Sequence, residues 1–224
     1  MYTALFFDVD DTLLNFELCS QAALCKTFNF FNIDYNEKVY KLFRDIDHHL
    51  WMKQKQGVLA VEEVLNFRFK QLLDGLNLGV DPIKFQSSFQ EYLSKECVLE
   101  ANAIEVIQYL SSKYKLYVTS NGILKMQLER LKLAGLLPYF SDVFVSDEIG
   151  YDKPNINFFR ECLERSQVHC EEILLVGDSL EADIIGANKS NIATCWYNPN
   201  NGIKKVDLKT DYIISNLLQL KKIL

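Results

Sequence analysis

Short apolar segments and longer amphipathic segments alternate along most of this chain. The apolar segments are rich in β-branched and aromatic residues, as is typical of buried strands. From about residue 102 onward they alternate with segments of helical periodicity, a pattern that predicts a parallel sheet with helices on both faces. The expected strands are 4–7, 116–118, 143–145, 173–176, 192–196 and 212–214. The expected helices are 103–112, 123–133, 154–165, 180–189 and 217–223.

Residues 17–97 interrupt this alternation, because their apolar positions follow helical spacing throughout. We therefore predict an α/β core with a doubly wound, Rossmann-like parallel sheet, formed by residues 1–16 and 98–224. An α-helical domain, 17–97, is inserted after the first strand and is expected to cap the carboxyl edge of the sheet, where α/β proteins bind ligands. Breaks between its helices are expected at Gly57, Gly75, Gly79 and Asp81-Pro82.

Composition limits the possible partners of this chain. Of its 224 residues, 49% are hydrophobic and 12% aromatic, which predicts a folded protein. Thirty acidic and 24 basic residues give a net charge of −6, which argues against nucleic acid as a partner. The N-terminal segment lacks a basic region and is too short for a signal peptide or a membrane span, so we expect a cytoplasmic protein without a membrane partner. The six scattered cysteines are interpreted as reduced thiols.

Two carboxylates stand at the end of the first predicted strand. Asp8 and Asp10 project on the same side, because strand side chains alternate. Their mutual repulsion would be relieved by a divalent cation, which favours a functional site. The alternative is that Asp10, Asp11 and Thr12 only cap the following helix.

Three later segments place similar chemistry after other strands. Ser120-Asn121-Gly122 offers a hydroxyl and backbone N–H groups for phosphoryl oxygens. Lys153-Pro154 places a positive charge just before a helix whose first turn holds the proline. Asp178 and Asp183 supply oxygen ligands of the kind that Mg²⁺ prefers. Taken singly, Ser120, Asp178 and Ser179 could be helix caps, and Lys153 a solvated surface lysine.

These four segments in this order resemble the haloacid dehalogenase (HAD) superfamily of hydrolases. The resemblance rests on Asp8-x-Asp10-x-Thr12, Ser120-Asn121, Lys153-Pro154 and Gly177-Asp178-x-x-x-x-Asp183. The helical insert is similar to the C1-type cap of that superfamily. Further motifs resemble the YjjG-type bacterial pyrimidine 5′-nucleotidases. They are Leu50-Trp51, Gly57, Gly135-Leu136-x-x-Tyr139-Phe140, Ser146-Asp147-Glu148-x-Gly150 and Thr194-Cys195-Trp196-x-Asn198.

The resemblance implies a Mg²⁺-dependent phosphate monoester hydrolase. Asp8 would be the nucleophile that forms an aspartyl-phosphate, and Asp10 the acid and base. Metal ligands would be the Asp8 and Asp178 carboxylates and the Asp10 carbonyl. The dehalogenases of the superfamily have no acidic residue at the position of Asp10, which favours phosphate esters here.

The resemblance also implies supporting and phosphate-binding roles for other residues. The phosphate would contact Ser120, Asn121 and Lys153, Asp183 would orient the metal ligands, and Thr12 would support the loop.

The expected substrate is a small phosphorylated metabolite, and the second resemblance indicates a nucleoside 5′-monophosphate. Trp51 could contact the substrate from the cap by stacking on the base, and Phe16 is the second candidate for this contact. The alternative is that these aromatic side chains belong to the core of the helical domain, as such residues commonly do. Two alternatives stay open: a phosphatase of sugar phosphates or phosphoglycolate, and a receiver-like signalling domain. The latter also carries an acidic pair, a phosphoacceptor aspartate, a hydroxyl and a lysine, but it has no role for an insert of about 80 residues.

Overall fold

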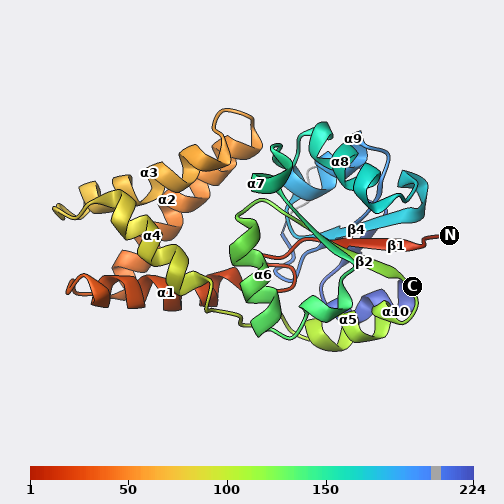
Figure 1. Ribbon diagram of the computed structural model, residues 1–224, viewed down its shortest axis with the longest axis horizontal. Coiled ribbons are helices and arrows are strands. Elements are labelled where there is room, and N and C mark those ends of the chain that lie inside the picture. Colours follow the sequence, from red (N-terminus) through yellow and green to blue (C-terminus); the bar gives the residue numbers. More distant parts are fainter. Residues whose placement is uncertain (203–207) are drawn as a thin grey trace. The chain divides into compact units, whose positions relative to one another are not determined.

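The chain divides into two compact units in a computed structural model that describes residues 1–202 and 208–224 (Figure 1). One unit joins Met1–Phe16 to Cys97–Leu224 and holds the sheet, and the other is Glu17–Glu96. Cys97, which the predicted insert includes, lies in the sheet-containing unit. All six cysteines are free thiols, as predicted.

A parallel sheet with the order β3-β2-β1-β4-β5-β6 forms the centre of the first unit. This confirms the predicted doubly wound fold, because the chain runs outward from β1 to β3 on one side and from β4 to β6 on the other. The observed strands match the predicted ones within two residues at each end. They are β1 (Ala4–Phe7), β2 (Lys115–Ser120), β3 (Asp142–Val145), β4 (Ile173–Gly177), β5 (Ala193–Tyr197) and β6 (Tyr212–Ile214).

Each face of the sheet is covered by its own set of helices (Figure 1). Leu5 and Phe7 pack into a cluster with residues of α5, α6 and α10, while Ala4 and Phe6 face the helices α8 and α9. This alternation follows from the period of two in a strand and explains why β1 is apolar at every position. The helices of this unit are α5 (Ala103–Ser111), α6 (Leu124–Leu133), α7 (Ser146–Ile149), α8 (Ile156–Ser166), α9 (Ile185–Lys189) and α10 (Leu220–Ile223). Three 3₁₀ turns are η1 (Leu137–Tyr139), η2 (Cys170–Glu172) and η4 (Leu217–Gln219), and η3 (Leu180–Ile184) is a π-helical segment directly before α9.

The second unit is helical and contains no strand in any of its residues, all of which the structure describes. Its core is aromatic: Phe43 stacks on Phe69 at 5.5 Å, and Phe69 meets Phe89 edge-on at 4.9 Å. The predicted helix breaks are confirmed, and Asp81 caps the last helix by accepting from the Ile83 N–H at 2.9 Å. Most of this unit is formed by α1 (Phe16–Phe30), α2 (Glu37–Lys55), α3 (Val61–Gly75) and α4 (Pro82–Leu93).

The carboxyl ends of the central strands are in register, which positions the candidate site. Phe7, the last residue of β1, pairs with Val118 on β2 and with Val176 on β4. Asp8, Thr119 and Gly177 therefore follow at one level of the sheet, at the point where the strand order reverses. In open α/β sheets this switch point is where ligands bind. Within the described ranges 1–202 and 208–224, no helix has the length and apolar character that crossing a bilayer requires.

Candidate active site

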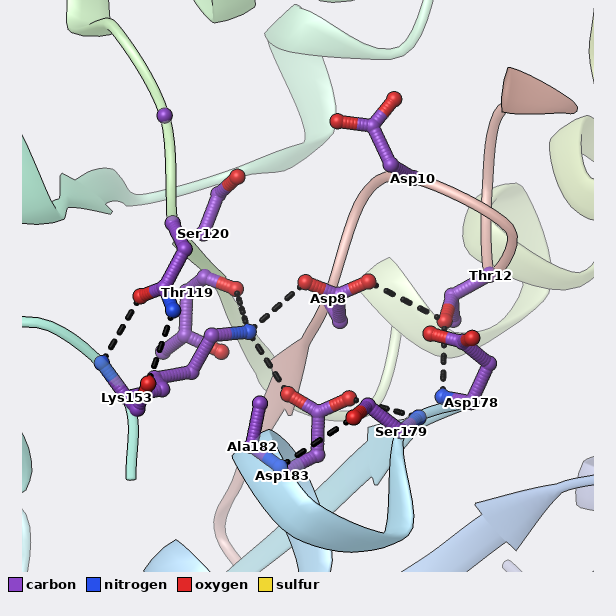
Figure 2. A network of polar contacts seen from close by, with 12 residues as sticks. Asp8, Asp10, Thr12, Thr119, Ser120, Lys153, Asp178, Ser179, Ala182 and Asp183 are labelled. Carbon is purple, nitrogen blue, oxygen red and sulfur yellow. Dashed lines mark hydrogen bonds and ion pairs between the residues drawn. The ribbon is translucent and has the colours of Figure 1, made fainter. Parts of the chain in front are cut away.

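Asp8 lies at the centre of the site, directly after β1 (Figure 2). It is 7% exposed, and its backbone N–H donates to the carbonyl of Val176 on β4 at 3.0 Å. Its Oδ1 accepts from Lys153 Nζ at 2.7 Å and its Oδ2 from Thr12 Oγ1 at 3.3 Å. The Thr12 oxygen in turn accepts from the Asp178 N–H at 3.1 Å. Thr12 thus joins the loop after β1 to the loop after β4.

Lys153 is buried beside Asp8 and is not the solvated surface lysine of the alternative interpretation. Its Nζ lies 2.7 Å from Asp8 Oδ1, 2.6 Å from Asp183 Oδ1 and 2.8 Å from the Thr119 carbonyl. An ammonium has three N–H donors, so these contacts match its capacity. The residue is 1% exposed, and a buried charge of this kind is tolerated only with such partners.

Burial and charge shift the ionisation of this pair in defined directions. Burial raises the pKa of the Asp8 carboxyl to about 7, while the charge of Lys153 opposes that shift. Burial alone would lower the pKa of Lys153, but the carboxylates of Asp183 and Asp8 outweigh it and raise the pKa above its ordinary value. Lys153 therefore keeps its positive charge at neutral pH.

Asn121 fixes the backbone of Lys153. Its Oδ1 accepts from the Lys153 N–H at 2.7 Å, and its Nδ2 donates to the Lys153 carbonyl at 2.8 Å. The prediction that Pro154 lies in the first turn of a helix is wrong. Helix α8 begins at Ile156, because the Asn155 side chain accepts from the Asn157 N–H and caps the helix after the proline.

Three carboxylates converge next to this lysine. One oxygen each from Asp8, Asp178 and Asp183 lies within 4.8 Å of the others, a hard-oxygen donor set that fits a divalent cation. Asp183 is 1% exposed and is held by Lys153 and by the Ser179 N–H at 3.0 Å, whereas Asp178 is half-buried. Trp196 Nε1 donates to the Asp178 carbonyl at 2.7 Å and fixes that backbone. Gly177 is required here, since a Cβ at this position would lie 2.4 Å from Asp183 Oδ2.

The loop after β1 uses its polar residues in different ways. Asp11 Oδ1 accepts from the N–H of Phe16, the first residue of α1, so the capping interpretation holds for Asp11. It does not describe Thr12, which bonds to Asp8 and to the Asp178 backbone. Asp10 also points elsewhere, to Gln127 and Arg130 on α6.

Gln127 and Arg130 are the site residues that our sequence analysis missed. Both are fully buried on α6, although neither is apolar. Their signal was the presence of two polar residues, three positions apart, on the core-facing stripe of an amphipathic helix.

The remaining candidates lie at several places in the chain. Ser120 is 2% exposed, and its Oγ accepts from Gln127 Nε2 at 3.0 Å. Ser179 Oγ accepts from the Ala182 N–H at 3.1 Å, so the capping alternative is right for this residue. Trp51 lies half-buried on α2, and Phe16 begins α1.

A family model described as haloacid dehalogenase-like hydrolase matches residues 5–197 of the chain. The chain belongs to this family. The HAD hydrolase is 34% identical over 224 residues to the HAD-hydrolase YfnB of Bacillus subtilis, a match covering 100% of the chain and 95% of the relative. A crystal structure of YfnB, described as bound to magnesium, superposes with a TM-score of 0.95 at 33% identity and covers 100% of this chain and 98% of that one.

Two further relatives of this HAD hydrolase carry names that state an activity. Pyrimidine 5′-nucleotidase YjjG of Escherichia coli is 27% identical over 98% of the chain and 96% of its own length. A glyceraldehyde 3-phosphate phosphatase of Methanothermobacter thermautotrophicus is 29% identical over the full length of both chains. The predicted superfamily, with YjjG among the relatives, is confirmed. The receiver-like alternative is set aside, because the family is one of hydrolases.

Proposed function

We propose that this hydrolase cleaves phosphate monoesters with Mg²⁺, by way of an aspartyl-phosphate on Asp8, and that its substrates are nucleoside 5′-monophosphates. The observation that carries the proposal is the contact of Asp8 with the buried ammonium of Lys153, beside Asp178, at the switch point of the sheet. A carboxylate held between a fixed cation and further acidic groups is suited to attack a phosphoryl group whose charge needs compensation. The names of the relatives support the same reaction class.

The Mg²⁺ ligands in this proposal are the Asp8 and Asp178 carboxylates and the Asp10 main-chain carbonyl. The metal, when bound, would offset negative charge on the phosphoryl oxygens. Asp183 would orient the metal ligands without binding the metal itself, since its two oxygens already accept from Lys153 and from the Ser179 N–H. Thr12 would keep Asp8 and Asp178 in place through its two hydrogen bonds.

The bonds made and broken involve Asp8 and Asp10. An Asp8 oxygen bonds to phosphorus as the ester P–O bond breaks, and the leaving oxygen takes a proton from Asp10. Asp10, now a carboxylate, then removes a proton from the water that splits the aspartyl-phosphate into free Asp8 and phosphate.

Ser120 would hold a phosphoryl oxygen during both steps, and Lys153 would direct to the phosphoryl group the N–H that contacts Asp8 in this structure. The Ser120 hydroxyl accepts from Gln127 and so keeps its own proton to donate. The Asn121 side chain would contribute by fixing the Lys153 backbone.

The helical unit Glu17–Glu96 would serve as the cap domain and select the substrate. We propose Trp51 as the aromatic that stacks on the base, with Phe16 as the second candidate. A sugar phosphate is the alternative substrate, supported by the glyceraldehyde 3-phosphate phosphatase among the relatives.

Phosphate release from a panel of metabolites tests the proposal. The panel holds pyrimidine and purine mononucleotides, sugar phosphates and phosphoglycolate, each with Mg²⁺ and with a chelator. We expect turnover only with Mg²⁺, no turnover for Asp8→Asn and almost none for Asp10→Asn. Either variant keeping most of its phosphatase rate would overturn the mechanism. If pyrimidine mononucleotides were not among the better substrates, the nucleotidase assignment would be overturned, but the mechanism would not.

Trp51→Ala and Trp51→Phe test the stacking residue. Loss of one stacked base, worth about 1–3 kcal/mol, should raise KM for nucleotides about 5- to 150-fold in Trp51→Ala, and Trp51→Phe should restore most of it. KM for a sugar phosphate should not change. Equal effects on both substrate classes would contradict the assignment of Trp51.

A further inference from the structure

Two residues of helix α6 hold the carboxylate of Asp10. Arg130 Nη1 lies 2.6 Å from Asp10 Oδ1, and Gln127 Nε2 lies 2.9 Å from Asp10 Oδ2. Residues three positions apart share one side of a helix, so a single face of α6 contacts both carboxylate oxygens. More than 110 positions separate Asp10 from either residue, and only the fold brings them together.

The burial of this pair differs from that of a structural ion pair. Arg130 is fully buried, yet the Asp10 side chain is 28% exposed. In the helical unit, by contrast, Arg68 and Asp47 form an ion pair in which each side chain is 3% exposed. Burying a guanidinium costs free energy even when it is paired. The contrast indicates that the buried Arg130 side chain holds the Asp10 carboxylate in place, while part of that carboxylate stays accessible to a substrate.

Gln127 connects Asp10 to the phosphate-binding residue Ser120. Its Nε2 also donates to Ser120 Oγ at 3.0 Å, and an amide NH₂ has a proton for each acceptor. Because they share this donor, Asp10 Oδ2 and Ser120 Oγ lie within about 6 Å of each other. Gln127 Oε1 accepts from Arg130 Nη1 at 3.2 Å, which fixes the orientation of the amide.

We propose that Gln127 and Arg130 are positioning residues that hold the Asp10 carboxylate next to the bound phosphoryl group for proton transfer. The inference rests on the proposed function, in which Asp10 is the acid and base. Proton transfer needs the carboxyl within hydrogen-bond reach of the leaving oxygen, and an accessible aspartate without fixed partners would populate several rotamers. Neither α6 residue needs to contact the substrate in this role.

The test compares two substrates that differ in their need for a proton. Phenyl phosphate and p-nitrophenyl phosphate have similar shapes, but p-nitrophenolate leaves without protonation far more readily. Gln127→Met removes the donor at nearly constant size, and Arg130→Lys keeps the charge without the planar fork. Glu129→Gln, exposed on the same helix, is the matched control. Single-turnover release of the leaving group is measured with Mg²⁺.

We expect Gln127→Met and Arg130→Lys to slow phenyl phosphate cleavage about 10- to 100-fold, because a positioned acid is worth about 10²–10⁴ in rate. The loss with p-nitrophenyl phosphate should be several-fold smaller. The enzyme concentration that gives half of the maximal single-turnover rate should change little, and Glu129→Gln should behave as wild type. Equal losses with both substrates would indicate a structural effect and overturn the inference. Because Arg130 is fully buried, Arg130→Lys could fail to fold, and in that case Gln127→Met alone tests the positioning role.

A double-mutant cycle separates this inference from the proposed function. In an Asp10→Asn background, Gln127→Met should cause no further loss of p-nitrophenyl phosphate cleavage, because the group it positions is absent. A further loss as large as in wild type would contradict a role through Asp10. If Asp10→Asn is itself fully active on phenyl phosphate, the acid/base assignment falls. If Asp10→Asn is inactive while Gln127→Met is fully active, only the positioning role falls.

Discussion

The ammonium of Lys153 lies 2.7 Å from the carboxylate of Asp8, although 145 positions separate the two residues in the chain. The same nitrogen contacts Asp183 at 2.6 Å, so one buried cation stands between two buried carboxylates. Figure 2 shows the three side chains converging at the edge of the sheet, those of Asp8 and Lys153 from loops and that of Asp183 from η3. The buried charge of Lys153 is therefore compensated by both carboxylates.

Removing the central cation should destabilise the fold as well as abolish activity. For Lys153→Met we expect a loss of about 3–5 kcal/mol in the free energy of unfolding, since two buried carboxylates lose their partner. Urea denaturation without added metal measures this loss. Lys189→Met, at an exposed lysine of α9, is the control and should change stability by less than about 0.5 kcal/mol. Equal stability of the two variants would show that Lys153 does not hold the cluster together.

Asp8→Asn should stabilise the protein at neutral and higher pH. Burial raises the pKa of Asp8 to about 7, so the native state retains a proton that the unfolded chain loses near pH 4. Stability therefore falls as pH rises between these two values, and the amide removes that dependence. With a chelator present, we expect Asp8→Asn to exceed wild type by about 1–3 kcal/mol at about pH 8 and to match it at about pH 4. A constant difference across this range would contradict the shift.

Mg²⁺ should stabilise the folded chain through the acidic cluster. A ligand that binds only the native state adds about 2.7 kcal/mol when its concentration is 100 times its dissociation constant. We expect thermal unfolding to move upward with Mg²⁺ in wild type, and Asp178→Asn to lose most of that response. Glu171→Gln removes an exposed carboxylate from the same unit and should respond as wild type. An unchanged response in Asp178→Asn would remove this residue from the metal ligands.

Gly177→Ala should disturb the site without removing any polar group. The added Cβ would lie 2.4 Å from Asp183 Oδ2 and 2.5 Å from its Cγ, so the Asp183 side chain must shift from the position in which it contacts Lys153. We expect a loss of about 1–3 kcal/mol in stability, as for overpacking of a core, together with a marked loss of turnover. Gly79→Ala has open space around the new Cβ and should be nearly neutral in both measurements. Wild-type activity in Gly177→Ala would show that Asp183 can be displaced without consequence.

The sequence by itself determined the α/β architecture and which residues lie together in most of the candidate site. Apolar segments as short as Ala4–Phe7 predicted the strands because buried parallel strands are apolar on both faces. Once the strands were placed, parallel order required that Asp8, Ser120 and Asp178 meet at one edge. The start of α8 was misplaced because the capping residue Asn155, rather than Pro154, determines where that helix begins.

Only the tertiary structure decided which polar residues contact one another. Asp10, Asp11 and Thr12 are all plausible helix caps in sequence, yet only Asp11 caps α1. Gln127 and Arg130 could not be assigned to the site from the sequence, since their contacts with Asp10 depend on how α6 packs against the sheet. Local propensity acts over a few residues, whereas a hydrogen bond between distant residues exists only after the chain has folded.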